Sequence, residues 1–239
     1  MHLKNYDAIL LLSGGIDSTT ALYKLVAQGK KVLCLIFDYG QSLIKEVDVA
    51  KKNAERLHQD YKVIKIDLSF SGSKCSLISH DTPIAIGRTF DQIDGNIPTS
   101  YVEFRNGILL SYAVMVAECN NIGKIYGGFN GLHSGQYYDD TMDFIKAFEV
   151  CANKGTKPSF HVEICAPFAN VEKSEIVKQG IALGVDYGTT WSCYRNGEEH
   201  CGACDSCKQR QRALEIGGYY VHSRKDTGSF RGSHAPASI

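Results

Sequence analysis

A loop of glycine, acidic and hydroxyl residues follows the first apolar run of the chain. Residues 8–12 read AILLL, and the string SGGIDS occupies residues 13–18. Backbone N–H groups at the start of a helix are unpaired and carry partial positive charge, so such a start binds phosphate well. Two glycines allow close approach to an anion, and Ser13 and Ser18 can add hydroxyl donors. A plain strand-to-helix turn with a serine cap would use the same residue types, so the loop alone leaves both interpretations open.

Asp17 differs in chemistry from its neighbours in this loop. A carboxylate cannot bind a phosphate directly, because both groups are anionic. It can hold Mg²⁺, which prefers oxygen ligands, or it can fix the loop by accepting backbone N–H bonds.

Metal-binding chemistry is indicated near the other end of the chain. Four of the nine cysteines cluster there, namely Cys193, Cys201, Cys204 and Cys207. The last three form overlapping CxxC pairs, a spacing that lets thiolates reach one tetrahedral ion. Four thiolates satisfy Zn²⁺ with no open position, which predicts a structural zinc site, and an iron–sulfur cluster is the alternative. His200 could replace one ligand, but it stands directly beside Cys201 and is interpreted as a bystander.

The elements that must position these groups follow from the alternation of apolar patterns. Strands are predicted at residues 6–13, 31–40, 61–69, 124–130 and 159–168, and helices at residues 18–28, 46–58, 105–119, 140–153 and 172–184. Strands that alternate with helices predict an α/β fold with a parallel, five-stranded, doubly wound sheet. Ligands in such folds sit at the carboxyl ends of the strands, which is where SGGIDS lies.

The composition argues against several kinds of partner. Lys plus Arg and Asp plus Glu both number 26, so the formal net charge is zero and no nucleic-acid partner is expected. No apolar run approaches the roughly 20 residues that a membrane helix needs. The N-terminal residues lack the pattern of a secretion signal. We therefore expect a cytoplasmic protein without a membrane partner.

The glycine loop also matches a known motif. SGGIDS resembles the PP-loop, SGGxDS, of the N-type ATP pyrophosphatases, and it differs from the P-loop GxxxxGK[ST]. The resemblance implies that ATP is cleaved between its α- and β-phosphates, with Mg²⁺ as the accompanying ion. Pyrophosphate then leaves, and AMP passes to an oxygen of a second substrate.

Both motifs together narrow the resemblance to one family. The chain resembles the 7-cyano-7-deazaguanine synthase (QueC) family up to about Gly217, through the strings LLSGGIDSTT, FDYGQ, IPTSYVEFRN, GFN, KSEIVKQGIALGVDYGTTWSCY and CGACDSCKQR. The resemblance implies an adenine nucleotide alpha hydrolase-like domain with a small C-terminal zinc lobe built on four cysteines, assembled as a homodimer. Residues 1–188 would form the ATP-pyrophosphatase domain, residues 189–217 the zinc lobe and residues 218–239 a flexible basic tail. Residues 69–100 have weak periodicity and are expected to form a functional or mobile loop.

The implied reaction is the activation of a carboxylate. ATP adenylates 7-carboxy-7-deazaguanine, and ammonia displaces AMP to give an amide. A second adenylation, on the amide oxygen, permits loss of water to the nitrile. Negative charge gathers on phosphate in each transition state, so fixed donors and Mg²⁺ are expected to dominate catalysis.

The resemblance also implies roles for individual residues. The pyrophosphate cradle would consist of Ser13, Gly14, Gly15, Asp17 and Ser18, and the adenosine would lie near Asp38, Tyr39 and Gln41. The catalytic groups would be Asp17, Arg105 and Lys173. Arg105 would face phosphate or the substrate carboxylate, with a core position as its alternative. Lys173 stands in the first turn of a helix, where a cation is unfavourable, so it is expected to reach a phosphate unless it is a solvated surface lysine. Trp191 could stack on a planar base or pack the zinc lobe.

Departures from the family pattern concentrate in two strings. Members usually read YVPARN where this chain has Glu103 and Phe104 in YVEFRN. After GFN they usually carry Asp-Tyr-Ser-Gly-Tyr-Pro-Asp-Cys, whereas this chain substitutes Leu132, His133, Tyr138 and Asp140. These strings are expected to line the acceptor side, so they favour a changed second substrate, although drift at a tolerant site gives the same pattern.

Three alternatives to ammonia-dependent nitrile synthesis stay open. A different amine, such as the amino end of a partner protein, would stop the reaction at an amide, and QueC-like proteins of bacterial anti-phage systems make this outcome plausible. A PP-loop tRNA sulfurtransferase would need a persulfide-forming cysteine or an iron–sulfur centre. A non-catalytic zinc module would have no use for an intact SGGIDS loop.

Overall fold

The five predicted strands form one parallel sheet. The computed structural model describes residues 5–41, 44–79, 81–95, 97–131, 137–195 and 197–220. Its strands are β1 (Ala8–Leu11), β2 (Val32–Asp38), β3 (Asp60–Lys65), β4 (Lys124–Gly127) and β5 (Glu163–Cys165). Their order across the sheet is β3-β2-β1-β4-β5, and every neighbouring pair is parallel. The predicted α/β class and five-stranded parallel sheet are therefore confirmed.

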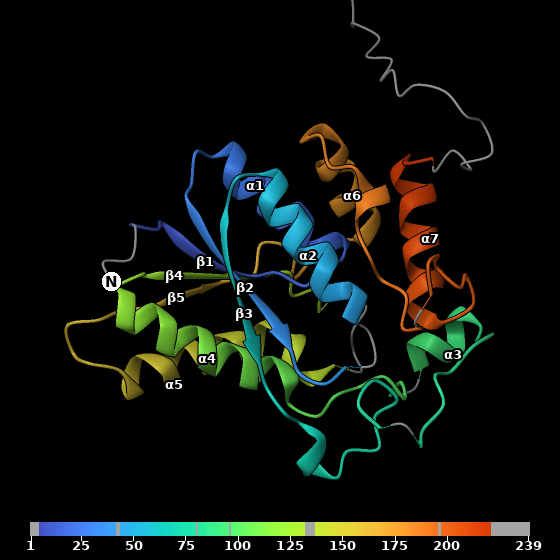
Figure 1. Ribbon diagram of the computed structural model, residues 1–239, viewed down its shortest axis with the longest axis horizontal. Coiled ribbons are helices and arrows are strands. Elements are labelled where there is room, and N and C mark those ends of the chain that lie inside the picture. The colour runs from blue at the N-terminus through green and yellow to red at the C-terminus, as the bar shows by residue number, and fades with distance from the viewer. Residues whose placement is uncertain are drawn as a thin grey trace, which may run out of the picture.

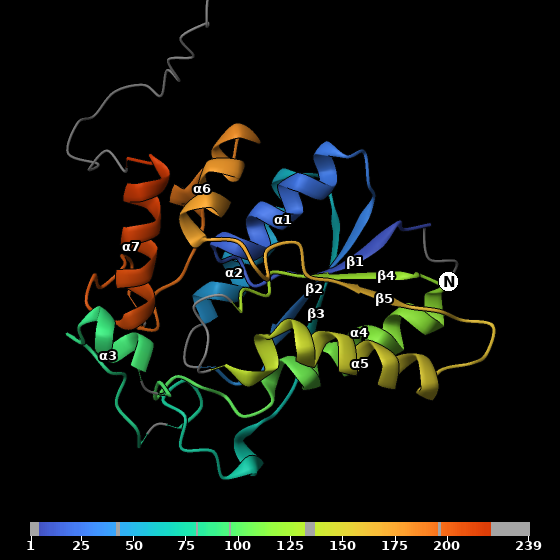
Figure 2. The ribbon, with the colours of Figure 1, turned by 180° about the vertical axis from the view of Figure 1, so that it is seen from behind.

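Helices cover both faces of this sheet (Figures 1 and 2). They are α1 (Ile16–Ala27), α2 (Ile44–Arg56), α3 (Phe90–Gly95), α4 (Arg105–Asn120), α5 (Met142–Gly155), α6 (Lys173–Ala182) and α7 (Asp205–Gly217). One face carries α1, α2 and α6, and the opposite face carries α4 and α5. Among the described helices, none has the length and apolarity to cross a membrane.

The two faces explain why the central strand β1 is apolar throughout. Ile9 and Leu11 of β1 join the core beneath α4 and α5, whereas Leu10 and the following Leu12 join the core beneath α1, α2 and α6. Successive side chains of a strand point to opposite faces, so a central strand covered on both sides has no polar position. The sheet is doubly wound for this reason.

The order of the strands also creates a crevice. The chain builds β1, β2 and β3 towards one edge of the sheet and then continues with β4 on the other side of β1. Leu11 is level with Leu35 of β2 and with Gly127 of β4. Loops that leave β1 and β4 therefore diverge at a switch point, where ligands bind in open α/β sheets.

The cysteine-rich segment contains a helix that the sequence patterns did not predict. Helix α7 lies beside α6 (Figure 1), and its residues Ala213 and Leu214 belong to the core beneath α1, α2 and α6. A Cβ at Gly217 would lie 2.4 Å from Val177 Cγ1, so the two helices are in close contact. The boundary drawn at residue 188 remains a prediction.

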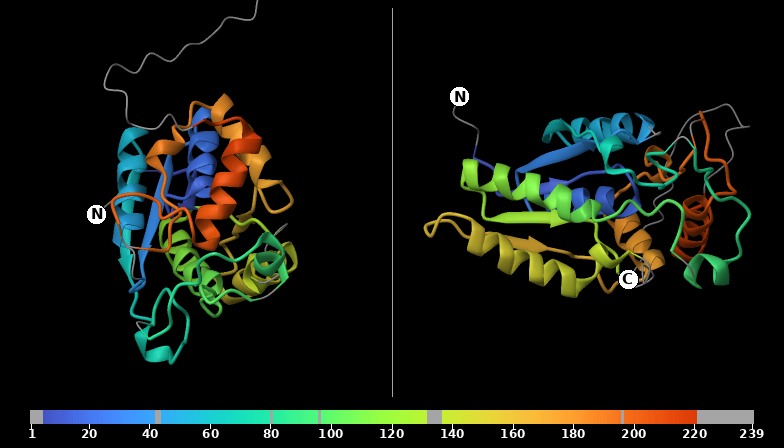
Figure 3. Two further views of the ribbon diagram at one scale, coloured as in Figure 1. Left: turned by 90° about the vertical axis from the view of Figure 1, so that its right-hand side faces the viewer. Right: turned by 90° about the horizontal axis from the view of Figure 1, so that it is seen from below.

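Part of the long stretch at residues 69–100 packs against the cysteine-rich segment and α7. Helix α3 lies at the N-terminal end of α7 (Figure 3). Arg88 Nη1 pairs with Asp205 Oδ2 at 2.7 Å, and Gly87 N donates to Ala203 O at 3.0 Å. The Arg212 guanidinium lies 4.8 Å from the centre of the Phe90 ring.

The predicted flexibility of the basic tail falls almost entirely on residues 221–239, which lie outside the described residues.

Candidate active site and four-cysteine centre

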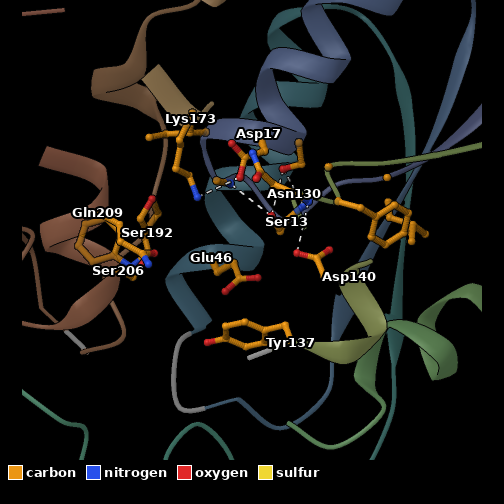
Figure 4. Close-up of a pocket in the computed structure, with 18 of the residues that line it drawn as sticks. Ser13, Asp17, Glu46, Asn130, Tyr137, Asp140, Lys173, Ser192, Ser206 and Gln209 are labelled. Carbon is orange, nitrogen blue, oxygen red and sulfur yellow. Dashed lines mark hydrogen bonds and ion pairs between the residues drawn. The ribbon is translucent and has the colours of Figure 1, made fainter. Parts of the chain in front are cut away.

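A cavity of about 410 Å³ opens at the carboxyl ends of β1, β2 and β4 (Figure 4). Its wall combines the loop after β1, the first turns of α2, α4 and α6, and the segment that contains the cysteines. Seven of the predicted site residues line it: Ser13, Gly15, Asp17, Ser18, Tyr39, Arg105 and Lys173. The cavity thus gathers residues that are up to 160 positions apart (173 minus 13) in the sequence.

The glycine loop is held tightly against its surroundings. Ser13 Oγ and Ser18 Oγ lie 3.0 Å apart, and Gly15 N donates to Ser13 Oγ at 3.4 Å. Trp191 N donates to Gly14 O at 2.9 Å, which joins the loop to the cysteine-rich segment. The first N–H groups of α1 have no acceptor within the helix, so they are available to an anion in the cavity.

Gly14 is required for this packing. Its φ is +78°, and a Cβ would lie 2.9 Å from Ala50 N and 3.2 Å from Glu46 O. We expect Gly14→Ala to lower the free energy of unfolding by more than the roughly 1–2 kcal/mol that a left-handed alanine costs by itself. Gly29 is a matched control, because its φ is +73° and nothing lies within 4 Å of its Cβ position.

Denaturant unfolding of the two variants separates the contributions. The difference between Gly14→Ala and Gly29→Ala reports the clash with α2 alone, since both variants carry a similar backbone strain. Equal destabilisation of the two variants would contradict a required close contact between the loop and α2.

Asp17 and Lys173 form an ion pair at the end of the loop. Lys173 Nζ lies 3.1 Å from Asp17 Oδ2, and the Asp17 carboxylate raises the pKa of Lys173, which therefore stays protonated. Asp17 Oδ1 is buried without a hydrogen-bond partner among the described residues. An unpartnered carboxylate oxygen fits a divalent cation such as Mg²⁺. Asp140 lines the same cavity, and burial raises its pKa to about 6.

A second group of side chains lies on the α2 and α4 side of the cavity. Arg105 Nη1 donates to Tyr39 OH at 3.5 Å, and burial raises the pKa of Tyr39 to about 12. Glu46, in the first turn of α2, also faces the cavity, and burial raises its pKa to about 7. Glu46 was not predicted as a site residue. Its position five residues after Gln41 of FDYGQ, at the first residue of a predicted helix, was the available signal.

Three predicted binding residues do not line the cavity. Gln41 Nε2 donates to Phe37 O at 3.1 Å, and Gln41 Oε1 accepts from Tyr39 N at 2.7 Å. Both ends of this buried amide hold the turn after β2, so its role in the structure is to position Tyr39. Asp38 Oδ1 accepts from Gly40 N at 3.5 Å in the same turn. Gly14 packs against α2 and does not line the cavity.

The altered strings lie in different places. Phe104 has a left-handed φ of 54° and packs edge-on against Phe144 at 5.7 Å, outside the cavity. Glu103 accepts a hydrogen bond from Ser73 Oγ at 2.6 Å beside a separate hollow of about 220 Å³. Asp140 does line the main cavity, and Tyr138 is exposed. Leu132 and His133 lie outside the described residues.

The four predicted metal ligands converge. One ligand atom from each of Cys193, Cys201, Cys204 and Cys207 lies within 4.8 Å of the others. Four thiol groups at this separation fit a tetrahedral ion such as Zn²⁺. Trp191 packs against this cluster and also lines the cavity. Ser192 and Tyr194, on either side of Cys193, line the cavity as well. The four-cysteine centre therefore supports one wall of the cavity.

Sequence comparisons with known proteins agree with the family resemblance over most of the chain. Residues 7–218 match the family model described as "Queuosine biosynthesis protein QueC". A 7-cyano-7-deazaguanine synthase from Trichodesmium erythraeum is 39% identical over 213 residues, covering 87% of this chain and 95% of that protein. One from Myxococcus xanthus is 37% identical over 217 residues, covering 88% and 94%. Among solved structures, the NMN synthetase from Francisella tularensis has a TM-score of 0.49 and 17% identity, covering 91% of this chain and 79% of that one. The chain belongs to the QueC family of queuosine biosynthesis proteins.

Proposed function

We propose that this protein uses ATP to adenylate the carboxylate of 7-carboxy-7-deazaguanine and transfers the acyl group to ammonia. A second adenylation of the resulting amide then leads to 7-cyano-7-deazaguanine. Membership of the QueC family supports the substrate, because the curated relatives are named for this nitrile product. The observation that carries the proposal is the cavity that joins the N-terminus of α1 to Lys173, Arg105 and the four-cysteine centre.

The nucleotide phosphates would bind at the start of α1. The loop residues Ser13, Gly14, Gly15 and Ser18 would supply N–H and hydroxyl donors, and Lys173 would supply a positive charge. Asp17 would hold Mg²⁺ through the carboxylate oxygen that has no protein partner among the described residues. Tyr39, positioned by Gln41, would contact the adenosine, and Arg105 would bind the substrate carboxylate or the phosphate that is transferred to it.

Adenylation is needed because a carboxylate is a poor electrophile. Attack by the carboxylate oxygen on the α-phosphorus forms a C–O–P bond and releases pyrophosphate. Lys173 and the α1 N–H groups would stabilise the charge that gathers on the departing pyrophosphate. The four cysteines would hold Zn²⁺ as a structural ion that takes no part in this chemistry, since four thiolate ligands leave no open position.

The test is mass spectrometry of products formed from 7-carboxy-7-deazaguanine, Mg-ATP and ammonia. We expect AMP, pyrophosphate and free nitrile. Failure to release pyrophosphate with any deazaguanine acid would refute the proposal. Metal analysis that finds one zinc and no iron per chain would exclude a sulfurtransferase that depends on an iron–sulfur centre.

A second candidate is a ligase that couples the activated deazaguanine to another amine, such as the amino end of a partner protein. Asp140 favours it, because this substitution for the usual cysteine lies in the cavity. Glu103 and Phe104 give it less support, since neither lines the cavity. No free nitrile, together with mass added to a co-expressed protein, would support this candidate. A cytoplasmic homodimer remains our prediction for either activity.

A further inference from the structure

Glu46 is an acidic residue in the cavity that neither the sequence motifs nor the adenylation step uses. It lies in the first turn of α2, and its side chain points into the space between the glycine loop, Asp140 and Tyr137 (Figure 4). Its backbone packs against the glycine loop, since a Cβ built on Gly14 would lie 3.2 Å from Glu46 O. Its carboxylate lines the same cavity as the loop that is proposed to hold the phosphates (Figure 4).

The carboxylate of Glu46 is not committed to another protein group. Among the described residues, it accepts no hydrogen bond and forms no ion pair within 4.0 Å. The charged and titratable groups that face it are Arg105 from α4, Tyr39 after β2 and Tyr137 before α5. Asp17, Lys173 and Asp140 lie across the cavity. Arg105 attracts the charged carboxylate, whereas burial opposes it more strongly, and the net effect is a pKa raised to about 7.

An acceptor amine needs a proton acceptor in this reaction. Ammonia is mostly ammonium at neutral pH, and ammonium has no lone pair with which to attack an acyl carbon. A base whose pKa is near the working pH is best suited to remove the proton. The carboxylates of Asp17 and Asp140 are less suitable, because Asp17 pairs with Lys173 and Asp140 accepts a hydrogen bond from Asn130 N at 3.3 Å.

We propose that Glu46 is the proton acceptor for the attacking amine. This inference rests on the proposed function. Ammonium gives one proton to the Glu46 carboxylate, and the freed lone pair forms a C–N bond to the acyl carbon of the adenylate. The C–O bond to AMP breaks, and AMP leaves with the electron pair. The nitrogen then loses a second proton to solvent, which leaves a neutral amide and a protonated Glu46 that returns its proton to water.

The test separates adenylation from amine transfer in Glu46→Gln. Adenylation is measured as ATP–pyrophosphate exchange that depends on the deazaguanine acid, and transfer is measured as amide formation from ammonium chloride. We expect exchange to be retained, whereas amide formation falls roughly 10²-fold, as is typical when a general base is removed. Glu55→Gln is the matched control, because Glu55 lies on the exposed side of the same helix.

Hydroxylamine distinguishes proton removal from positioning. It is largely unprotonated at neutral pH and can attack without a base, so Glu46→Gln should form the hydroxamate at a rate close to that of the unmodified protein. Glu46→Asp should recover part of the ammonia-dependent rate. In the unmodified protein, the rate of amide formation should rise as the pH increases through about 7, where Glu46 becomes charged. This rise should be absent from the pH–rate profile of Glu46→Gln.

Each other outcome overturns the inference. If Glu46→Gln forms neither the amide nor the hydroxamate but retains exchange activity, Glu46 is a positioning residue. If Glu46→Gln loses exchange activity, Glu46 takes part in substrate binding. Unchanged amide formation in Glu46→Gln would show that no carboxylate is needed here. Absence of exchange in the unmodified protein would instead refute the proposed function, and this result does not depend on the variant.

Discussion

Replacing Lys173 with methionine is expected to lower carboxylate-dependent ATP–pyrophosphate exchange by roughly 10²–10³-fold, the usual cost of removing one preorganised donor from developing charge. Lys173 is the first residue of α6, and its Nζ lies 3.1 Å from Asp17 Oδ2 in the cavity. Its pKa is raised mainly by the Asp17 carboxylate, so the ammonium group is charged whenever ATP binds. Methionine keeps the length and apolar stem of lysine but removes the charge.

Lys178→Met is the matched control for this prediction. Lys178 lies on the same helix, its side chain is 54% exposed, and it pairs with Glu175 at 3.4 Å on the surface. A surface pair of this kind contributes about 0–1 kcal/mol, so the control should retain both exchange activity and stability. Retention of full exchange activity in Lys173→Met would show that the lysine only neutralises Asp17 and does not act on the nucleotide.

The position of Lys173 also shows what the sequence could and could not predict. A cation in the first turn of a helix is unfavourable, which correctly marked Lys173 as unusual. The sequence suggested phosphate as the compensating group, and in the structure Lys173 pairs with the carboxylate of Asp17. Asp17 is 156 positions away (173 minus 17), and its proximity depends on α1 and α6 packing on the same face of the sheet. Local patterns contain no information about such a pair.

The FDYGQ string illustrates a different limit. All five residues follow or end β2, and a resemblance cannot tell which of them turn towards a ligand. In the structure Tyr39 lines the cavity, whereas Gln41 uses both ends of its amide to hold the turn. Glu46 was missed because an acid in the first turn of a helix is common and needs no functional explanation. Its significance depends on burial beside Arg105, which only the tertiary structure provides.

The strands and most helices were predictable because their signals are strong and local. Continuous apolar runs such as residues 8–12 need a position that is buried on both faces, and the parallel sheet provides it. Helix α7 was obscured by the cysteines and basic residues that surround it. Helix α3 has six residues, too few for a clear helical period, and it is placed by the contacts of Arg88 with Asp205 and of Phe90 with Arg212 on α7.

Removing one ligand of the four-cysteine centre, by Cys204→Ser, is expected to abolish metal retention and adenylation together. Structural zinc contributes on the order of 10 kcal/mol to the folding of small zinc domains, which exceeds what the local packing of this segment could replace. Cys204 is fully buried, and it pairs with Ile86 in an antiparallel bridge next to α3. Loss of the ion should therefore disorder the segment from Trp191 to the start of α7, together with the adjacent part of residues 69–100.

Adenylation should fail because this segment is part of the cavity wall. Trp191 N holds the glycine loop through Gly14 O, and Ser192 and Tyr194 line the cavity beside Cys193. We expect one zinc per chain in the unmodified protein, none in Cys204→Ser, and a loss of exchange activity of at least roughly 10²-fold. Cys119→Ser is the matched control, because Cys119 is exposed on α4 and should change neither quantity. The core beneath α1, α2 and α6 contains none of the four cysteines, so far-ultraviolet circular dichroism should remain close to that of the unmodified protein. Full exchange activity in a metal-free Cys204→Ser protein would show that the cavity wall is maintained without the centre, and the metal would then have a role separate from the proposed reaction.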